Sequence, residues 1–322
     1  MTRRRIAFAV VALVAWAVGS ALGTVGPLPA AGATVTAIQI GKAHAEYTPV
    51  LDGSKPIFIL TLGSDSRPGT PIDRGLSDSI HIIAINLKKD RVTVLGFPRD
   101  SWVNIPGYGN DKVNSAMPRG GPQLTISTME ELTGIRFDYY VLTSFEGVQT
   151  AVDDVGGLNL DVPFPMHDSY SRVDLDPGRQ LLNGHDVLAF ARDRHSLSTG
   201  DFGRSENQGR VLIAALMQLR KEYATDPGRL LAYIGAGMRN MQTSLSLDEA
   251  IDFAFTALSV NPKQVVNVVV PGNTAMEGTK SVVLISSTAN AIYADLAKDG
   301  TLSKRSISLA PSPTRNQPGC CE

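Results

Sequence analysis

The stretch Ile57-Phe58-Ile59-Leu60-Thr61-Leu62 is a continuous apolar run, and it ends in the polar turn Gly63-Ser64-Asp65-Ser66-Arg67. A short apolar run bounded by a turn is typical of a strand that is buried on both faces. Residues 79–87 and 91–97 predict two further strands, and the short turn at residues 88–90 indicates that these two form an antiparallel hairpin. We therefore expect a sheet in which the first strand lies beside this hairpin.

Polar residues gather where these strands begin and end. If the first strand pairs antiparallel with the second, one edge of the sheet holds Asp65 and Arg67, Asp78, and Arg99 with Asp100. Two aspartates such as Asp65 and Asp78 suit Mg²⁺ or Mn²⁺, hard cations that take oxygen ligands and bridge to phosphates. Arg67 and Arg99 would take the remaining phosphate oxygens. Each cluster alone also fits an ordinary Asx-type turn or a local ion pair.

Helices and strands alternate along the rest of the chain. Residues 123–133 and 146–155 predict helices, and residues 138–145 predict a strand, so helices should cover the faces of an α/β sheet. A valine-rich strand at residues 264–270 needs a sheet to join, which places residues 53–300 in one domain. The tail at residues 301–322 is rich in proline, and we expect it to be disordered.

A second charged cluster is Arg192-Asp193-Arg194-His195, followed by Arg204 and Gln208. The apolar periodicity before it predicts a helix that ends near Arg192. Arginines two apart cannot share a helix face, so a loop would let Arg192 and Arg194 converge on one point. Arginine is suited to bidentate contact with phosphate, which makes a pyrophosphate clamp the functional interpretation. The alternative is a solvated charged loop between two helices.

The N-terminus begins with the basic stub at residues 1–5, which contains Arg3-Arg4-Arg5, and continues with an uncharged apolar run at residues 6–25. This length predicts a transmembrane anchor, and the basic flank predicts that the N-terminus is inside. Ala31-Gly32-Ala33 resembles a cleavage site, so a signal peptide is the alternative. Residues 26–52 would be a linker. In both interpretations the body of the protein is extracytoplasmic, which disfavours ATP-driven chemistry and DNA binding.

Composition limits the classes of partner. The 322 residues carry a net charge of −1, and 43% of them are hydrophobic, which is enough for one large α/β domain or two small ones. A chain without an overall basic field does not attract nucleic acid in bulk, so any polyanion site must be local. The adjacent Cys320 and Cys321 form no framework of separated disulfide pairs.

An ordered set of short motifs between residues 56 and 222 resembles the LytR–CpsA–Psr family of extracytoplasmic phosphotransferases. The motifs are Ile-Leu-Thr-Leu-Gly-Ser-Asp-Ser-Arg (59–67), Ser-Asp-Ser (77–79), Pro-Arg-Asp (98–100), Lys-Val-Asn-Ser-Ala (112–116), Gly-Gly-Pro (120–122), Phe-Glu-Gly (145–147), Val-Gly-Gly-Leu (155–158), Leu-Asn-Gly (182–184) and Arg-Asp-Arg-His…Asp-Phe-Gly-Arg…Gln (192–208). Each is weak alone, but their order is specific.

The resemblance implies transfer of an anionic glycopolymer from a polyprenyl-pyrophosphate carrier onto peptidoglycan, with release of polyprenyl phosphate. Wall teichoic acid, capsular polysaccharide and arabinogalactan are substrates in the family. The implied fold is a central mixed sheet flanked by helices, with an apolar groove for the prenyl chain.

The resemblance also implies roles for individual residues. Asp65 and Asp78 would hold Mg²⁺ (or Mn²⁺). The residues that would act in catalysis are Arg99, Asp100, Arg192, Arg194 and Arg204. Those that would contact the pyrophosphate are Arg67, Arg74, Arg99, Lys112, Arg192, Arg194, Arg204 and Gln208. No residue is clearly identified as the base for the acceptor hydroxyl, for which Asp100 is one candidate and His195 a weaker one.

Two positions depart from the family pattern. Leu76 stands where the family has arginine, and Arg74 lies two residues earlier; Asn207 stands where arginine is common. These departures leave two alternatives to the transferase. One is a hydrolase acting on the same polyprenyl pyrophosphate, and the other is a non-catalytic, membrane-anchored protein that binds the glycopolymer lipid.

Overall fold

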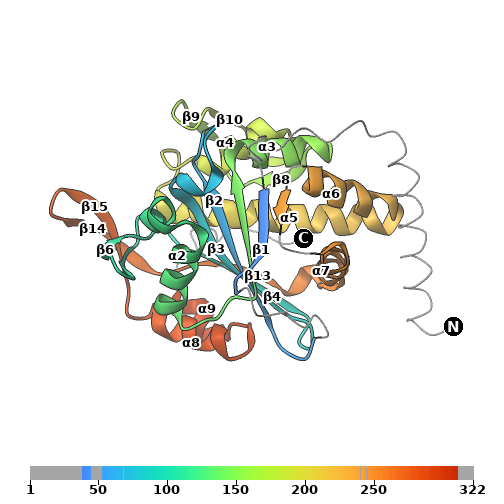
Figure 1. Cartoon of the computed structure of the whole chain (residues 1–322). Helices are drawn as coiled ribbons and strands as arrows, with labels where there is room; N and C mark the ends of the chain where they lie inside the picture. Colours follow the sequence, from blue (N-terminus) through green and yellow to red (C-terminus); the bar gives the residue numbers. More distant parts are fainter. Residues whose placement is uncertain (1–37, 45–52, 68, 240, 244–245, 311–322) are drawn as a thin grey trace. The chain divides into compact units, whose positions relative to one another are not determined.

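The computed structural model describes residues 38–44, 53–67, 69–239, 241–243 and 246–310. In this part of the chain a seven-stranded mixed sheet forms the centre of the fold (Figure 1). Its strands, in spatial order, are β12 (Met241–Thr243), β1 (Ile38–Lys42), β7 (Tyr139–Ser144), β2 (Ile57–Ser64), β3 (Ser77–Asn86), β4 (Arg91–Gly96) and β13 (Val265–Val269). The predicted first strand is the central β2, and all its residues are buried.

The pairing of three strands is the one expected from the sequence. β2 runs antiparallel to β3, with Ser64 opposite Ser77, and β3 runs antiparallel to β4. β7 is parallel to β2, and β13 is parallel to β4, so the predicted valine-rich strand does join this sheet. The end of β2, the start of β3 and the end of β4 therefore lie at one edge.

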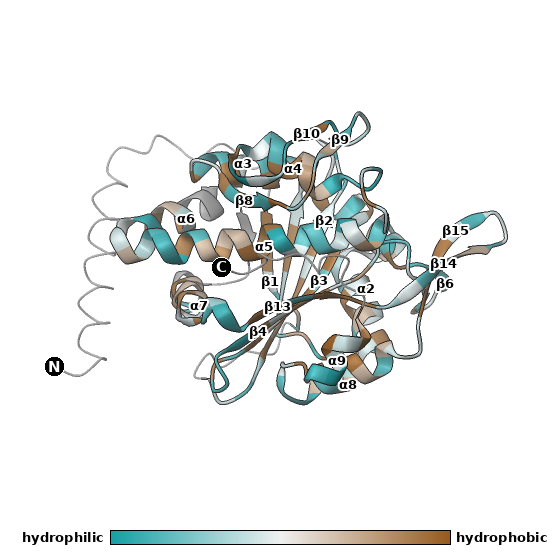
Figure 2. Cartoon of the chain, turned by 180° about the vertical axis from the view of Figure 1, so that it is seen from behind, coloured by the Kyte–Doolittle hydropathy of each residue, from teal (hydrophilic) through white to brown (hydrophobic). Residues whose placement is uncertain are grey.

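Helices cover both faces of the sheet (Figure 2). Side chains alternate along β2, so that Leu60 and Leu62 belong to one apolar cluster and Ile57 and Ile59 to another. The first cluster packs against α2 (Ala116–Thr133), α8 (Ala289–Asp299) and α9 (Lys304–Leu309). The second packs against α5 (Asp201–Thr225) and α7 (Leu247–Ser259). The predicted α/β architecture with flanking helices is confirmed.

A third apolar cluster lies beside the sheet edge and is built around the fully buried Val187 and Phe190. It joins α3 (Phe145–Asp154), α4 (Gly184–Arg192) and α5 to two small antiparallel pairs. These pairs are β8 (Leu158–Val162) with β11 (Gly178–Leu182), and β9 (Met166–Asp168) with β10 (Val173–Leu175). α6 (Gly228–Arg239) packs against α3 and α5. The elements joined by this cluster lie opposite the ends of β2, β3 and β4.

Two further hairpins extend from the other side of the same edge. They are β5 (Trp102–Ile105) with β6 (Gly109–Lys112), and β14 (Gly272–Glu277) with β15 (Lys280–Ile285). The backbone N–H of Val283 donates to the carbonyl of Asp100 over 2.9 Å, which ties β15 to the segment that follows β4. Figure 1 shows the β14–β15 hairpin projecting from the body of the domain. The remaining short helices are η2 (Ile72–Arg74), η3 (Val113–Ser115) and η4 (Pro262–Gln264).

The structure corrects three boundaries. The helix predicted at 123–133 begins earlier, as α2, and is interrupted at Gly120 and Gly121, where Gly121 has a φ of 66°. The predicted linker at 26–52 contains β1, because residues 38–42 pair with β7 in the sheet. The tail at 301–322 is not disordered at residues 301–310, because Leu302 and Ala310 are buried against the core and α9 lies between them.

The predicted anchor at residues 6–25 lies outside the described residues. Among the residues that are described, no helix combines the length and the apolar character needed to cross a membrane. A capping box is present at Ser246: the Ser246 hydroxyl accepts from the N–H of Glu249, and the Glu249 carboxylate accepts from the N–H of Ser246. It fixes the start of α7.

Candidate active site

Three strand ends bring charged residues into one pocket. Asp65 follows β2, Asp78 is the second residue of β3, and Arg99 comes shortly after β4. With Arg67 and Arg192 they line a pocket of about 590 Å³. We call it the charged pocket. The predicted convergence of residues 65, 67, 78 and 99 therefore occurs, because both strand pairings are antiparallel as expected.

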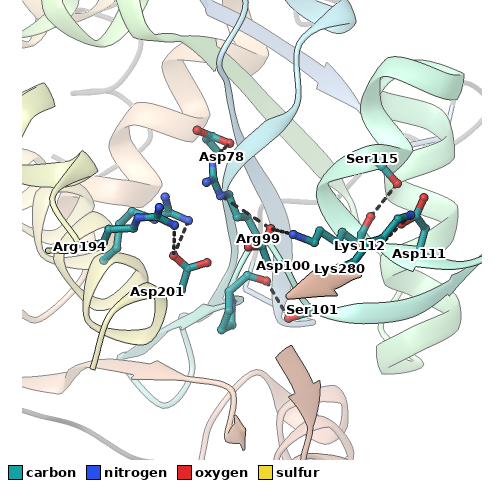
Figure 3. Close-up of polar contacts among 12 residues, drawn as sticks. Asp78, Arg99, Asp100, Ser101, Asp111, Lys112, Ser115, Arg194, Asp201 and Lys280 are labelled. Carbon is teal, nitrogen blue, oxygen red and sulfur yellow. Dashed lines mark hydrogen bonds and ion pairs between the residues drawn. The ribbon is translucent and has the colours of Figure 1, made fainter. Parts of the chain in front are cut away.

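Arg99 is the centre of an ion-pair chain (Figure 3). Its Nη1 donates to Asp78 Oδ1 over 2.6 Å, and its Nε lies 3.9 Å from Asp100 Oδ1. Lys112 Nζ lies 3.2 Å from the same Asp100 oxygen. Burial alone would lower the pKa of the Arg99 guanidinium, but the ion pair with Asp78 and the charge of Asp100 raise it above its ordinary value. Arg99 therefore remains a fixed positive charge.

Asp65 is a partly buried carboxylate with another negative charge nearby. Burial and the nearby negative charge of Asp78 raise the pKa of the Asp65 carboxyl, although the N–H of Leu76 donates to its Oδ1 over 2.6 Å. A divalent cation between the two carboxylates would relieve this repulsion. Among the described residues no group of three or more His, Cys, Asp or Glu side chains could hold a metal. A pair of carboxylates is nevertheless the kind of donor set with which Mg²⁺ binds when substrate phosphates complete its shell.

The loop between α4 and α5 supplies the other side of the site. α4 ends at Arg192, as predicted, and Asp193 Oδ1 then accepts from the backbone N–H of His195 over 3.1 Å. This turn brings Arg192, Arg194 and His195 to one cavity. The loop closes at Gly200, whose φ of 53° suits glycine, and α5 begins at Asp201.

Asp201 holds two of the arginines. Its Oδ1 lies 3.0 Å from Arg204 Nη2 and 4.0 Å from Arg194 Nη1, and Figure 3 shows Arg194 directed toward it. Burial lowers the pKa of the Arg204 guanidinium, and the charge of Asp201 partly offsets this effect. An arginine with a side chain only 7% exposed is fixed in place before any ligand binds.

Gln208 joins the two halves of the site. Its Nε2 donates to the carbonyl of Asp78 over 3.1 Å and to the carbonyl of Ala191 over 3.2 Å. The amide thus connects β3 to the end of α4, so the two amide protons are directed to the backbone. The structure gives Gln208 a role in holding the site together.

A second cavity, of about 380 Å³, lies between the sheet and helices α3, α4 and α5. We call it the apolar cavity. It shares Asp78, Arg99, Phe145 and Arg192 with the charged pocket, so these four residues form the boundary. Its apolar lining includes Leu62, Val141, Val148, Leu188, Val211 and Leu212. The site therefore places an apolar wall beside charged residues, because Asp168, Arg194 and Arg204 also line this cavity.

Three predicted site residues line neither of these two spaces. The Arg74 side chain is 65% exposed and lies 3.9 Å from Asp73. Asp100 and Lys112 pair with each other beside Arg99 (Figure 3). At the position where the family has arginine, Leu76 contributes its backbone N–H to Asp65. Asn207, the other departure, is buried in α5.

Three cavity residues were missed from the sequence. Phe145 stacks beneath Arg192, with the guanidinium carbon 4.6 Å from the ring centroid. Asp168, the last residue of β9, and Tyr170, in the turn that follows, also reach the cavity. Phe145 stood within a quoted motif without an assigned role, whereas the position of the β9–β10 turn depends on tertiary packing that no local pattern indicates.

Comparisons with known proteins identify the family of the chain. The model of the LytR_cpsA_psr family matches residues 31–298. A polyisoprenyl-teichoic acid–peptidoglycan teichoic acid transferase, TagU of Oceanobacillus iheyensis, is 36% identical over 200 residues, which cover 60% of this chain and 60% of TagU. A probable cell wall biosynthesis protein, LcpB of Corynebacterium glutamicum, is 37% identical over 183 residues, which cover 53% of this chain and 43% of LcpB.

The fold is similar to a solved structure. The crystal structure of B. subtilis TagV superimposes with a TM-score of 0.64 at 25% identity, covering 80% of this chain and 99% of that one. The chain spans less than two thirds of the length of the curated relatives TagU and LcpB.

Proposed function

Because the chain belongs to the LytR_cpsA_psr family, we propose that it transfers an anionic glycopolymer from a polyprenyl-pyrophosphate carrier onto peptidoglycan. The observation that carries the proposal is the shared boundary of the charged pocket and the apolar cavity. A polyprenyl pyrophosphate has a pyrophosphate head and a hydrocarbon tail. The charged pocket suits the head, and the apolar wall of the adjoining cavity suits the tail.

The names of the relatives support the substrate class. TagU is named as a transferase of teichoic acid to peptidoglycan, and LcpB as a probable cell wall biosynthesis protein. Both names concern glycopolymers of the cell wall. We extend this class, and not one particular polymer, to the present chain.

Phosphoryl transfer needs positioning and neutralisation of charge more than covalent participation by the protein. Arg99 and Arg192 lie at the boundary of the two spaces, and Arg194 and Arg204 line the cavity beside them. These four guanidinium groups would bind the pyrophosphate and stabilise the charge that develops on the leaving polyprenyl phosphate. Arg204 is preorganised by Asp201, so little reorganisation accompanies binding.

Asp65 and Asp78 would hold Mg²⁺ (or Mn²⁺), which would supply further charge neutralisation at the phosphates. The raised pKa of the Asp65 carboxyl supports this assignment, since one cause is the repulsion that a cation would remove. Asp78 also accepts a hydrogen bond from Arg99, so the same carboxylate would contact both the metal and an arginine that binds the pyrophosphate.

The site would face the outside of the cytoplasmic membrane. The basic residues 3–5 and the apolar residues 6–25 support a single-pass anchor with the N-terminus inside. In that arrangement the lipid carrier and the peptidoglycan acceptor are both accessible from the membrane surface.

The test uses the full-length protein in detergent with a glycopolymer linked to a polyprenyl pyrophosphate. Transfer to peptidoglycan is measured with and without Mg²⁺ for the wild type, Asp78→Ala and Arg192→Ala. We expect metal-dependent transfer that falls by about 10² to 10³ in each variant, the size of effect seen when one charge-stabilising group is lost. Asp174→Ala and Arg179→Ala, at exposed positions outside both spaces, should keep wild-type rates.

Each alternative activity has its own signature in this assay. Phosphate-lipid release that does not depend on acceptor would indicate a hydrolase. Tight lipid binding without turnover, with any divalent metal or acceptor, would indicate a binding protein, and the departures at Leu76 and Asn207 would then explain the loss of catalysis.

A further inference from the structure

A carboxylate–histidine pair lies on the wall of the apolar cavity. His195 Nδ1 is 3.1 Å from Asp168 Oδ2, although the two residues are 27 positions apart. Both line the cavity together with Arg192 and Arg194. The pair joins the β9–β10 turn to the α4–α5 loop, so it spans the two segments that surround the site on this side.

The contacts of Asp168 determine which histidine nitrogen carries the proton. Asp168 is almost fully buried and accepts from the N–H groups of Tyr170 and Ser171 and from the Ser171 hydroxyl. Burial would raise the pKa of the Asp168 carboxyl, but its bonds with His195, Tyr170 and Ser171 hold that pKa far below its usual range. Asp168 is therefore an anion that only accepts, so the proton lies on His195 Nδ1. The Nε2 of the neutral ring then presents its lone pair.

The orientation of the His195 ring is fixed on a second side. The ring of Tyr170 packs against it with centroids 4.8 Å apart, while Asp193 accepts from the His195 backbone N–H. The imidazole remains 45% exposed, so a solvent-side substrate can reach it. A histidine held by a buried carboxylate on one nitrogen and open on the other has the arrangement of a general base.

The other candidate base is less well placed. Asp100 is engaged by Lys112 over 3.2 Å and lies beside Arg99, and it lines neither the charged pocket nor the apolar cavity. Its contacts are those of a residue that orients Arg99.

Building on the proposed function, we propose that His195 is the general base that removes the proton from the acceptor sugar hydroxyl, and that Asp168 is its positioning residue. The hydroxyl oxygen forms a bond to the phosphorus that carries the glycopolymer, and its proton passes to His195 Nε2. The bond from that phosphorus to the bridging oxygen breaks, and its electron pair leaves with the polyprenyl phosphate. His195 then returns the proton to solvent.

The charged and titratable groups around His195 set its response to pH. Asp168 and Tyr170 face it from the β9–β10 turn, Asp193 lies on its own loop, and Arg99, Asp78, Arg192, Arg194 and Arg204 share its cavity. Protonation of the imidazole removes the lone pair, so transfer should fall on the acid side of the pH–rate profile.

The experiment compares His195→Gln and Asp168→Asn with the wild type as full-length proteins. The matched control is His167→Gln, because His167 and Asp174 form a pair 2.7 Å apart on the β9–β10 hairpin that is exposed and does not line the cavity. Transfer rates are measured across pH, and binding of geranylgeranyl pyrophosphate is measured separately.

We expect His195→Gln to lower kcat/KM for transfer by about 10² to 10⁴, the usual contribution of a general base, and to flatten the acid limb. Binding of geranylgeranyl pyrophosphate should change less than about threefold, a margin well below the tenfold that 1.4 kcal/mol represents. Asp168→Asn should lower the rate, because the neutral amide no longer holds the His195 ring with its proton on Nδ1. His167→Gln should behave as the wild type. Added imidazole should partly restore transfer by His195→Ala.

Three results would overturn the inference. A wild-type rate and pH profile in His195→Gln would remove His195 from catalysis and leave the proposed transferase intact. Loss of lipid binding in parallel with transfer would make His195 a binding contact. Absence of transfer in the wild type, with Mg²⁺ and acceptor present and lipid bound, would reject both the transferase and its base.

Discussion

The charged pocket and the apolar cavity share four residues but are built in different ways. The pocket is assembled from strand ends and loop termini, and its side chains are tied by ion pairs such as Asp78 with Arg99. The cavity is lined by the face of the sheet and by three helices, and its apolar side chains also pack against the neighbouring core clusters. The pocket can therefore change its chemistry through single charged residues, whereas the size of the cavity depends both on the apolar side chains that line it and on how the helices pack on the sheet.

The two regions should respond to acid with opposite signs. Behind the cavity wall, His81 is fully buried; its Nε2 donates to the carbonyl of Ser205 over 2.9 Å, and its Nδ1 accepts from the hydroxyl of Ser79. Burial lowers the pKa of His81 to about 4. In the pocket, burial and Asp78 raise the pKa of Asp65. The unfolded state binds more protons at His81, and the folded state binds more at Asp65.

The largest of the effects that separate the two regions follows from His81. Its contribution to stability is present above its unfolded pKa of 6.5 and is lost as pH falls toward 4. The loss should reach about 3 kcal/mol, at about 1.4 kcal/mol per pKa unit. Urea unfolding of the wild type and His81→Gln between pH 7.5 and 4.5 measures it, since glutamine can make both hydrogen bonds without titrating. Parallel stability curves for the two proteins would contradict a neutral, buried His81.

A smaller effect should separate the cavity from the pocket. Val211→Phe adds an aromatic ring to the cavity lining and should displace about two CH₂ groups of a long prenyl chain, each contributing about 0.8 kcal/mol. We expect about tenfold weaker binding of a long-chain polyprenyl pyrophosphate and unchanged binding of geranyl pyrophosphate. Leu231→Phe, on the exposed side of α6, is the control. Equal losses for the two lipids would mean that the cavity does not hold the distal part of the chain.

The smallest effect should appear at the rim of the pocket. Arg67 is exposed but lines the charged pocket, whereas Arg74 lies outside both spaces. Arg67→Ala should weaken binding of geranyl pyrophosphate by about 0.2–1 kcal/mol at low salt, the range of exposed ion pairs, and Arg74→Ala should have no effect. Titrations at about 0.05 and 0.5 M NaCl measure this, because screening at high salt should erase the Arg67 difference. An Arg74 effect as large as that of Arg67 would show that the η2 segment moves toward the ligand.

The charged pocket could be predicted from the sequence because local signals determine it. The apolar run before Asp65 and the short turn before Arg91 identify β2 and the β3–β4 hairpin, and antiparallel geometry then brings Asp65, Asp78 and Arg99 together. The end of α4 at Arg192 was predictable for the same reason, since helical periodicity stops there.

The cavity could not be predicted in this way. Val141 and Leu212 line the cavity and also pack against the core. The sequence alone does not distinguish an apolar residue that lines a cavity from one that fills the core. The pairing of Asp168 with His195 depends on how the β9–β10 hairpin packs against the α4–α5 loop. The sequence analysis did not predict ordered structure at residues 38–42 and 301–310. Both segments are held by their contacts with the sheet and the core, and not by a strong local preference for a strand or a helix.

The position of β1 would limit the distance between the domain and the predicted anchor. β1 pairs with β7 and β12, so Ile38 already belongs to the sheet. If the predicted anchor ends at residue 25, only residues 26–37 would separate the bilayer from the sheet. A fully extended chain spans at most about 3.5 Å per residue. The domain would then stay within about 40 Å of the membrane surface. Such a short connection would restrict the domain to acceptors that lie close to the membrane.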